Sequence, residues 1–154
     1  MSVEFNIEGL DEVSRKLQAI GSQKVAKRIA RKAGRQAMNL VRDAARLNSK
    51  AIDDPDTKEK IHKNITVQGG KSRNANEIII RVGIKGGASQ NQHSVSTAGL
   101  SGGDTRHWRY IEFPTSRTTA TPFMRPALAN NIQQVTNKFV QVFDAELDKE
   151  LART

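Results

Sequence analysis

The sequence predicts an α+β fold in which a small antiparallel sheet packs against two long amphipathic helices. Two observations predict this fold. Apolar residues recur at helical spacing over residues 22–47 and again from residue 126 onward, and short runs rich in β-branched residues lie between these stretches. Because the sequence has no internal repeat and no shift in composition, residues 1–154 are expected to form a single domain.

The N-terminal region predicts a strand followed by a helix. Residues 3–7 alternate apolar and polar side chains, which is the period of a half-buried strand, and Gly9 ends the pattern. A first helix is then expected from Asp11, a candidate N-cap, to a break at Gly21 and Ser22.

Residues 22–47 predict a long amphipathic helix with one apolar and one basic stripe. Its expected buried positions are Val25, Ile29, Ala33, Ala37, Leu40, Ala44 and Leu47. The basic stripe lies roughly opposite and consists of Lys24, Arg28, Arg31, Arg35, Arg42 and Arg46. The segment 11–50 has eleven Lys and Arg against three acidic residues, so a net +8 of the total charge of +9 lies there. We expect the basic stripe to face solvent or a partner.

Three further strands and a long loop are expected after this helix. Residues 61–67 and 77–84 should pair as an antiparallel hairpin, since the second run is especially rich in β-branched residues. Residues 108–113 predict another strand. Residues 86–104 contain nine Gly or Ser in nineteen positions, so a flexible loop is expected there. We expect this loop to become ordered against a neighbouring subunit.

A second long helix is expected to the C-terminus, with Pro126 in its first turn, where the missing N–H is tolerated. Its expected buried stripe is Leu128, Ile132, Val135, Phe139, Val142 or Phe143, Leu147 and Leu151. Its last turns carry Asp144, Glu146, Asp148 and Glu150. Because acidic residues there oppose the helix dipole, they are candidates for pairing with the basic stripe of a neighbouring subunit.

The residues predict no catalytic, metal-binding or cofactor-binding site. The absence of cysteine excludes disulfides, thiolate zinc sites and cysteine nucleophiles. His62, His93 and His107 lack a second histidine or a carboxylate at the spacing that a helical metal site needs. We therefore expect no enzyme activity and no cofactor. The enzymatic alternative is a small basic nuclease that uses His107 with Arg106 and Arg109.

The basic stripe supports another alternative, a nucleic-acid-binding module. Clustered Lys and Arg bind polyanions by counterion release. However, the stripe lacks interleaved aromatic or amide side chains for base readout, and aromatic residues make up 5% of the chain. A stripe that faces acidic protein is therefore favoured over one that faces DNA.

Two segments resemble a bacteriophage family. Residues 108–115 (WRYIEFPT) and 120–128 (ATPFMRPAL) are similar to the signature of tail-completion, or head-tail joining, proteins of long-tailed phages, also labelled minor tail or neck proteins. The matching residues are Tyr110, Glu112, Phe113, Thr115, Pro122, Phe123, Arg125, Pro126 and Ala127. Two positions depart from the family pattern: Pro114 replaces the usual glycine, and residues 56–59 lack the glycine expected after the threonine.

The resemblance implies a virion structural protein of the tail or neck without catalytic function. It implies a homo-oligomeric ring, hexameric like the tail, that joins the tail tube protein to a head-side connector or stopper protein and can contact phage DNA in the channel. The expected location is the virion, and the host cytoplasm before assembly. No membrane segment is expected, because no apolar run reaches the length of a membrane span.

Within the resembling segments, two side chains have expected roles in packing. Phe123 is expected to anchor the core at the helix start, and Trp108 is also expected in the core. Arg125 is expected to pair either with a carboxylate of its own chain such as Glu112 or with one of a neighbouring subunit.

Overall fold

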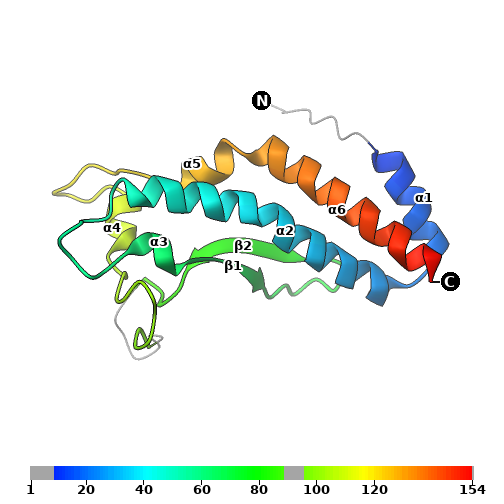
Figure 1. Ribbon diagram of the computed structural model, residues 1–154, viewed down its shortest axis with the longest axis horizontal. Helices are drawn as coiled ribbons and strands as arrows, with labels where there is room; N and C mark the ends of the chain where they lie inside the picture. The colour runs from blue at the N-terminus through cyan, green and yellow to red at the C-terminus, as the bar shows by residue number, and fades with distance from the viewer. Residues whose placement is uncertain (1–8, 89–95, 154) are drawn as a thin grey trace. The chain divides into compact units, whose positions relative to one another are not determined.

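The computed structural model describes residues 9–88 and 96–153 and has the α+β architecture that the sequence predicts (Figure 1). Its elements are, in order, α1 (Leu10–Ile20), α2 (Gln23–Lys50), α3 (Ile61–Asn64), β1 (Ile65–Gly70), β2 (Ile79–Ile84), α4 (Trp108–Glu112), α5 (Met124–Ala129) and α6 (Ile132–Ala152). The strands β1 and β2 pair as a two-stranded antiparallel sheet, which confirms the expected hairpin. The strand expected over residues 3–7 lies outside the described residues.

The chain divides into two compact units, and α2 contributes to both. The first unit contains the chain up to Leu40, residues 69–81 and the chain from Ile132 onward. The second unit contains residues 41–68 and 82–131. The single domain expected over residues 1–154 stays a prediction.

Glycines lie at both ends of α1. Gly9, with a φ of 81°, is the N-cap in place of the expected Asp11, which lies in the first turn together with Glu12. Carboxylates in a first turn interact favourably with the helix dipole, so Asp11 stabilises the helix from inside it. Gly21 has a φ of 64°, and its N–H donates to the carbonyl of Leu17 at 3.3 Å. Because this left-handed conformation favours glycine, Gly21 ends the helix at the expected break.

The first unit has an apolar core to which α1, α2 and α6 contribute. Its buried members are Val13, Ile29, Ala33, Phe143 and Leu147. Phe139 stacks on Phe143 with the ring centroids 5.4 Å apart. On the sheet side, Ile80 lies so close to Gly34 that a Cβ at position 34 would be 2.8 Å from its side chain. Ile80 of β2 therefore packs directly on the backbone of α2 at Gly34.

The helix α2 confirms the expected long helix, but its buried stripe differs from the predicted one in the last turns. Leu40 is 38% exposed and Leu47 is 70% exposed, although both were expected to be buried. The buried positions that follow Ala37 are Val41, Ala45 and Ser49. Buried residues thus recur every four positions, and each step moves about 40° further around the helix. Leu40 and Leu47 were expected to be buried because the predicted stripe ran parallel to the helix axis, whereas the buried stripe winds around the helix.

The strand expected over residues 61–67 forms only in its second half. Residues 61–64 form α3, and β1 begins at Ile65. The carboxylate of Asp53 accepts hydrogen bonds from the backbone N–H groups of Ile61 at 2.8 Å and His62 at 3.3 Å. Because the first N–H groups of a helix lack partners within it, this distant carboxylate favours a helical turn over a strand.

The strand expected over residues 108–113 is wrong, because this segment forms α4. The N–H of Phe113 donates to the carbonyl of Arg109 at 3.0 Å and closes the last turn. In a strand, Glu112 would share a face with Trp108 and Tyr110. In the structure Glu112 is buried, whereas Tyr110 is 56% exposed. Burial of the carboxylate against hydrogen-bond donors overrides the β-propensity of the segment.

The C-terminal helix is interrupted. Asn130 and Asn131 separate α5 from α6, so the helix that was expected to run on from Pro126 breaks there. The amide of Asn131 donates to the carbonyl of Ala127 at 2.8 Å, which gives a partner to a carbonyl at the end of α5. Pro126 lies in the first turn of α5, as expected.

The described ends of the loop expected over residues 86–104 are hydrogen-bonded to the second unit. The amide oxygen of Asn64 accepts the N–H of Gly102 at 3.0 Å, and the carbonyl of Gly102 accepts the N–H of Lys60 at 2.8 Å. Residues 89–95 lie outside the described residues. The ordering of this loop against a neighbour stays a prediction.

Candidate functional site

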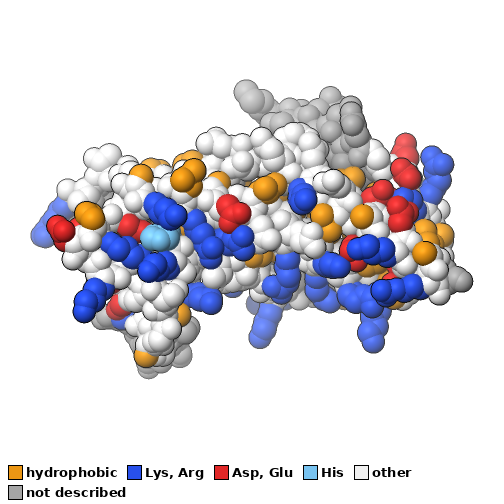
Figure 2. Space-filling model, viewed as in Figure 1, with side chains coloured by type: hydrophobic (Ala, Val, Ile, Leu, Met, Phe, Trp, Pro, Cys, Tyr) orange, Lys and Arg blue, Asp and Glu red, His pale blue; other side chains and the backbone are white. Residues whose placement is uncertain are grey.

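The first half of α2 presents an exposed basic face, which consists of Lys24, Arg31 and Arg35. The three residues lie within about 40° of one another around the helix, because they are seven and four positions apart. Figure 2 shows Lys and Arg side chains gathered over this half of α2. Across residues 9–88 and 96–153, no carboxylate forms an ion pair with any of the three. The charge of the basic face is therefore open to a partner.

The other three residues of the predicted basic stripe are engaged within the chain. Arg28 forms an ion pair with a carboxylate of α6 at 2.8 Å. Arg42 pairs with its neighbour Asp43 at 2.9 Å. Arg46 donates two hydrogen bonds, of 3.1 and 2.7 Å, to the carbonyl at the start of β1. These three therefore have partners within the described chain and the three of the basic face do not, and contact of any of the six with a partner stays a prediction.

The acidic end of α6 is also engaged within the first unit. Glu146 pairs with Lys32 at 2.9 Å and with Lys149 at 3.0 Å, and Glu150 pairs with Arg28. The hydrogen bond from Lys32, followed by the one from Lys149, lowers the pKa of Glu146 below its ordinary value. Pairing with cations of α2 thus accounts for acidic residues that oppose the dipole of their own helix.

A second ionic cluster, which was not predicted from the sequence, joins α1 to α6. The ammonium of Lys16 lies 2.6 Å from Asp144, 2.7 Å from Asp148 and 3.0 Å from Glu12. Hydrogen bonds to Asp144 and then to Asp148 raise the pKa of Lys16 well above its usual range. Three carboxylates around one ammonium leave this cluster negative. The four-residue spacings of Glu12 to Lys16 and of Asp144 to Asp148 were a signal for it in the sequence.

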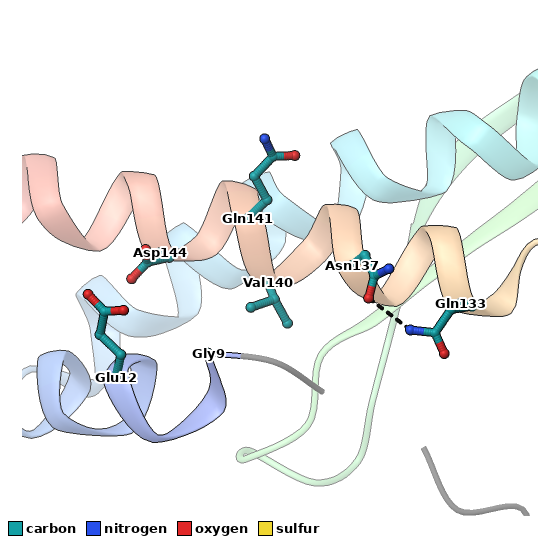
Figure 3. Close-up of a pocket in the computed structure, with 7 residues that line it drawn as sticks. All are labelled: Gly9, Glu12, Gln133, Asn137, Val140, Gln141 and Asp144. Atoms are coloured by element: carbon teal, nitrogen blue, oxygen red, sulfur yellow. Dashed lines mark hydrogen bonds between the residues drawn. The ribbon is translucent and has the colours of Figure 1, made fainter. Parts of the chain in front are cut away.

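A polar pocket of about 680 Å³ lies beside this cluster (Figure 3). It is lined by Gly9, Glu12, Gln133, Asn137, Val140, Gln141 and Asp144. The amide of Gln133 donates to Asn137 at 2.8 Å. The lining residues that the structure describes include no histidine or hydroxyl, and the two carboxylates among them, Glu12 and Asp144, are both paired with Lys16.

The buried Glu112 joins the two segments that carry the phage signature. Its carboxylate accepts hydrogen bonds from the backbone N–H groups of Phe123 at 2.8 Å and of Met124 and Arg125 at 2.9 Å. The guanidinium of Arg125 adds bonds to the same carboxylate at 3.1 Å and to the carbonyl of Glu112 at 2.6 Å. Phe123 is fully buried. Arg125 therefore has its carboxylate partner within its own chain.

The stability of this joint is expected to depend on pH. Burial raises the pKa of Glu112. The hydrogen bonds from the N–H groups of Met124, Phe123 and Arg125 lower it by more than burial raises it, so the pKa lies below its ordinary value of 4.5. The carboxylate then stabilises the fold fully above the ordinary pKa, and this stabilisation is lost as the pH falls through the folded-state value. Urea unfolding at about pH 7, 5 and 3 should show a steeper loss of stability for the natural chain than for Glu112→Gln. Parallel losses would contradict this account.

A surface hollow of about 470 Å³, called here the aromatic pocket, lies beside α4. It is lined by Ala88, Trp108, Arg109, Tyr110, Phe113, Pro114 and Thr115. These residues include the single Trp and the single Tyr of the chain. Trp108, which was expected in the core, is half-buried and donates to the carbonyl of Gly87 at 3.0 Å. The guanidinium of Arg109 lies over the ring of Tyr110, 5.3 Å from its centroid.

The histidines form no metal site in the described parts of the chain. His62 pairs with a buried carboxylate at 2.7 Å. Beside His107, Arg106 forms an ion pair with Asp104 and lowers the pKa of that carboxyl to about 2, so Arg106 is already engaged. His93 lies outside the described residues. Elsewhere the described chain contains no group of three or more His, Asp or Glu arranged for a metal ion. None of its helices combines the length and apolar composition of a membrane span.

Comparison with known proteins identifies the family. A family model described as "Bacteriophage HK97-gp10, putative tail-component" matches residues 11–113, which is more than half of the chain. The match includes Glu112 and Phe113 and ends before Phe123 and Arg125. No curated protein and no solved structure matches the chain. The chain belongs to the HK97-gp10-like family of bacteriophage tail components.

Proposed function

We propose that this protein is a tail-completion subunit that forms a ring, hexameric like the tail, and joins the tail tube protein to the head-side connector or stopper protein. The observation that carries the proposal is the presence of two open contact surfaces of different chemistry, the basic face and the aromatic pocket. A ring subunit between two partners needs separate surfaces for its neighbours in the ring and for the proteins above and below. Family membership supports the place of the protein in the tail.

In this proposal the basic face contacts acidic protein surface. Two glutamates of α6 are already paired with cations of their own chain, so the acidic partner is sought on the tail tube or the connector protein. A channel lined by Lys24, Arg31 and Arg35 would form many phosphate contacts and hold DNA tightly, whereas a conduit must let it slide. The protein is proposed to act in the virion and to wait in the host cytoplasm before assembly, without cofactor or catalytic role.

Charge reversal of the basic face tests this proposal. The double variant Arg31→Glu and Arg35→Glu should bind tail tubes at least about tenfold more weakly in a co-sedimentation assay, because two attractive contacts become repulsive. The matched control is Lys50→Glu, which reverses an exposed cation at the other end of α2 and should leave binding unchanged. Equal binding by all variants would show that the basic face is not part of the interface with the tail tube.

The same variants distinguish the nucleic-acid alternative. If the basic face binds DNA, the affinity of the natural chain for duplex DNA should fall steeply with salt, and the double variant should lose about two units of that salt slope. Lost DNA binding combined with unchanged tube binding would favour a DNA-facing helix. We expect the double variant to lose tube binding and the natural chain to show no steep salt dependence of DNA binding.

A further inference from the structure

We propose that the aromatic pocket receives Leu47 and Asp43 of a second copy of this chain, and that this contact repeats around the ring. The inference deepens the proposed function and rests on its claim that the subunit forms a ring. It assigns one defined interface between subunits.

The aromatic pocket has the composition of an interface hot spot. Tyr110 and Phe113 are 56% and 47% exposed, and the single Trp of the chain lines the same hollow. Trp, Tyr and Arg are the residue types that most often dominate binding energy at interfaces. Arg109 forms no ion pair with a carboxylate within the described residues, so the pocket combines apolar surface with one unmatched cation.

The second half of α2 carries a surface that complements this pocket. At 70% exposure, Leu47 is the most exposed large hydrophobic residue of the described chain. Asp43 lies four positions earlier, on the same side of the helix, and its side chain is 61% exposed. Its ion-pair partner in the described chain is the adjacent Arg42. An apolar side chain and an exposed carboxylate thus project together from one helix turn.

The two surfaces match in chemistry. Leu47 would bury its apolar side chain against Trp108, Tyr110 and Phe113, while Asp43 would meet the guanidinium of Arg109. Because the two surfaces are different patches, the contact between two subunits is heterologous: each subunit uses its pocket toward one neighbour and Leu47 toward the other. A heterologous contact between identical chains forms a closed ring when the rotation from one subunit to the next divides a full turn evenly, and a ring is the assembly that the proposed function requires.

Two exposed positions test the contact in sedimentation velocity and negative-stain electron microscopy. Leu47→Asp and Tyr110→Asp should each weaken subunit association about thirtyfold or more, because each places a charge where apolar surface is buried. The matched control is Leu128→Asp, which changes a leucine that was expected to be buried but is 46% exposed and belongs to neither surface. It should assemble like the natural chain. Circular dichroism should show the same helix content for all variants.

A mixing experiment tests the direction of the contact. Leu47→Asp retains an intact pocket, and Tyr110→Asp retains an intact Leu47, so an equal mixture should form heterodimers and no rings. Charge exchange tests the polar part: Asp43→Arg and Arg109→Asp should each weaken association, and the double variant that carries both changes should restore it.

Each contrary outcome has a distinct meaning. If the natural chain forms rings and both Asp variants form them equally well, this contact is wrong and the proposed function stands. If only one of the two variants weakens association, the two surfaces do not meet each other, and the inference is again overturned. If the natural chain forms no ring alone or on tail tubes, the contact and the proposed function fail together.

Discussion

Replacing Glu112 by Ala is expected to lower the free energy of unfolding by about 4 kcal/mol. The change removes the acceptor for the backbone N–H groups of Phe123, Met124 and Arg125 and leaves the guanidinium of Arg125 without its carboxylate. Each donor left without a partner in a buried site costs about 1 to 3 kcal/mol. Urea unfolding followed by circular dichroism measures the loss.

Two further variants make this prediction specific. Glu112→Gln keeps the shape of the side chain but places an NH₂ group against N–H donors, so its free energy of unfolding should be lower by about 2 kcal/mol. Asp56→Ala removes an exposed carboxylate of the same unit and should change stability by less than about 0.5 kcal/mol. A Glu112→Ala variant as stable as the Asp56→Ala control would show that the two motif segments are not joined through Glu112.

Replacing Gly102 by Ala is expected to lower the free energy of unfolding by about 3 kcal/mol. A Cβ at this position would lie 2.3 Å from the carbonyl oxygen of Lys60 and 2.7 Å from the side chain of Asn64. Relief of these contacts must move the backbone and thereby breaks the hydrogen bonds that Gly102 forms with Lys60 and Asn64. Thermal unfolding should show the loss as a lower midpoint.

The matched control for this change is Gly83→Ala. There the new Cβ would lie 3.1 Å from the end of the Gln68 side chain, which can move aside, so the cost should stay below about 1 kcal/mol. Equal midpoints for the two variants would contradict the close packing of the loop end against α3.

Elements with long periodic patterns could be predicted from the sequence. The 28 residues of α2 repeat the helical spacing often enough for their helical state to be clear, and Gly21 marks the break before them. The second strand of the hairpin is rich in β-branched residues and was found close to its true position, whereas the first begins four residues later than predicted. In these elements, local preference and tertiary packing favour the same structure.

The failures occurred where a partner outside the segment decides its local structure. Asp53 supplies acceptors to the first turn of α3, and the N–H groups near Phe123 draw Glu112 into the core, so segments with strand patterns became helical. Asp53 lies eight residues before Ile61 and Glu112 eleven before Phe123, and neither pairing follows from the period of apolar residues within the segment. The aromatic pocket was missed for a related reason, because only a helical turn turns Tyr110 outward and buries Glu112.

Electron microscopy of the purified protein, alone and mixed with tail tubes of the same phage, shows whether the subunits form a ring that caps the tube. We expect closed rings of the natural chain, with sixfold symmetry, seated on the end of the tube that receives the head. Single subunits that leave the tube ends bare at concentrations where tubes are stable would contradict this expectation.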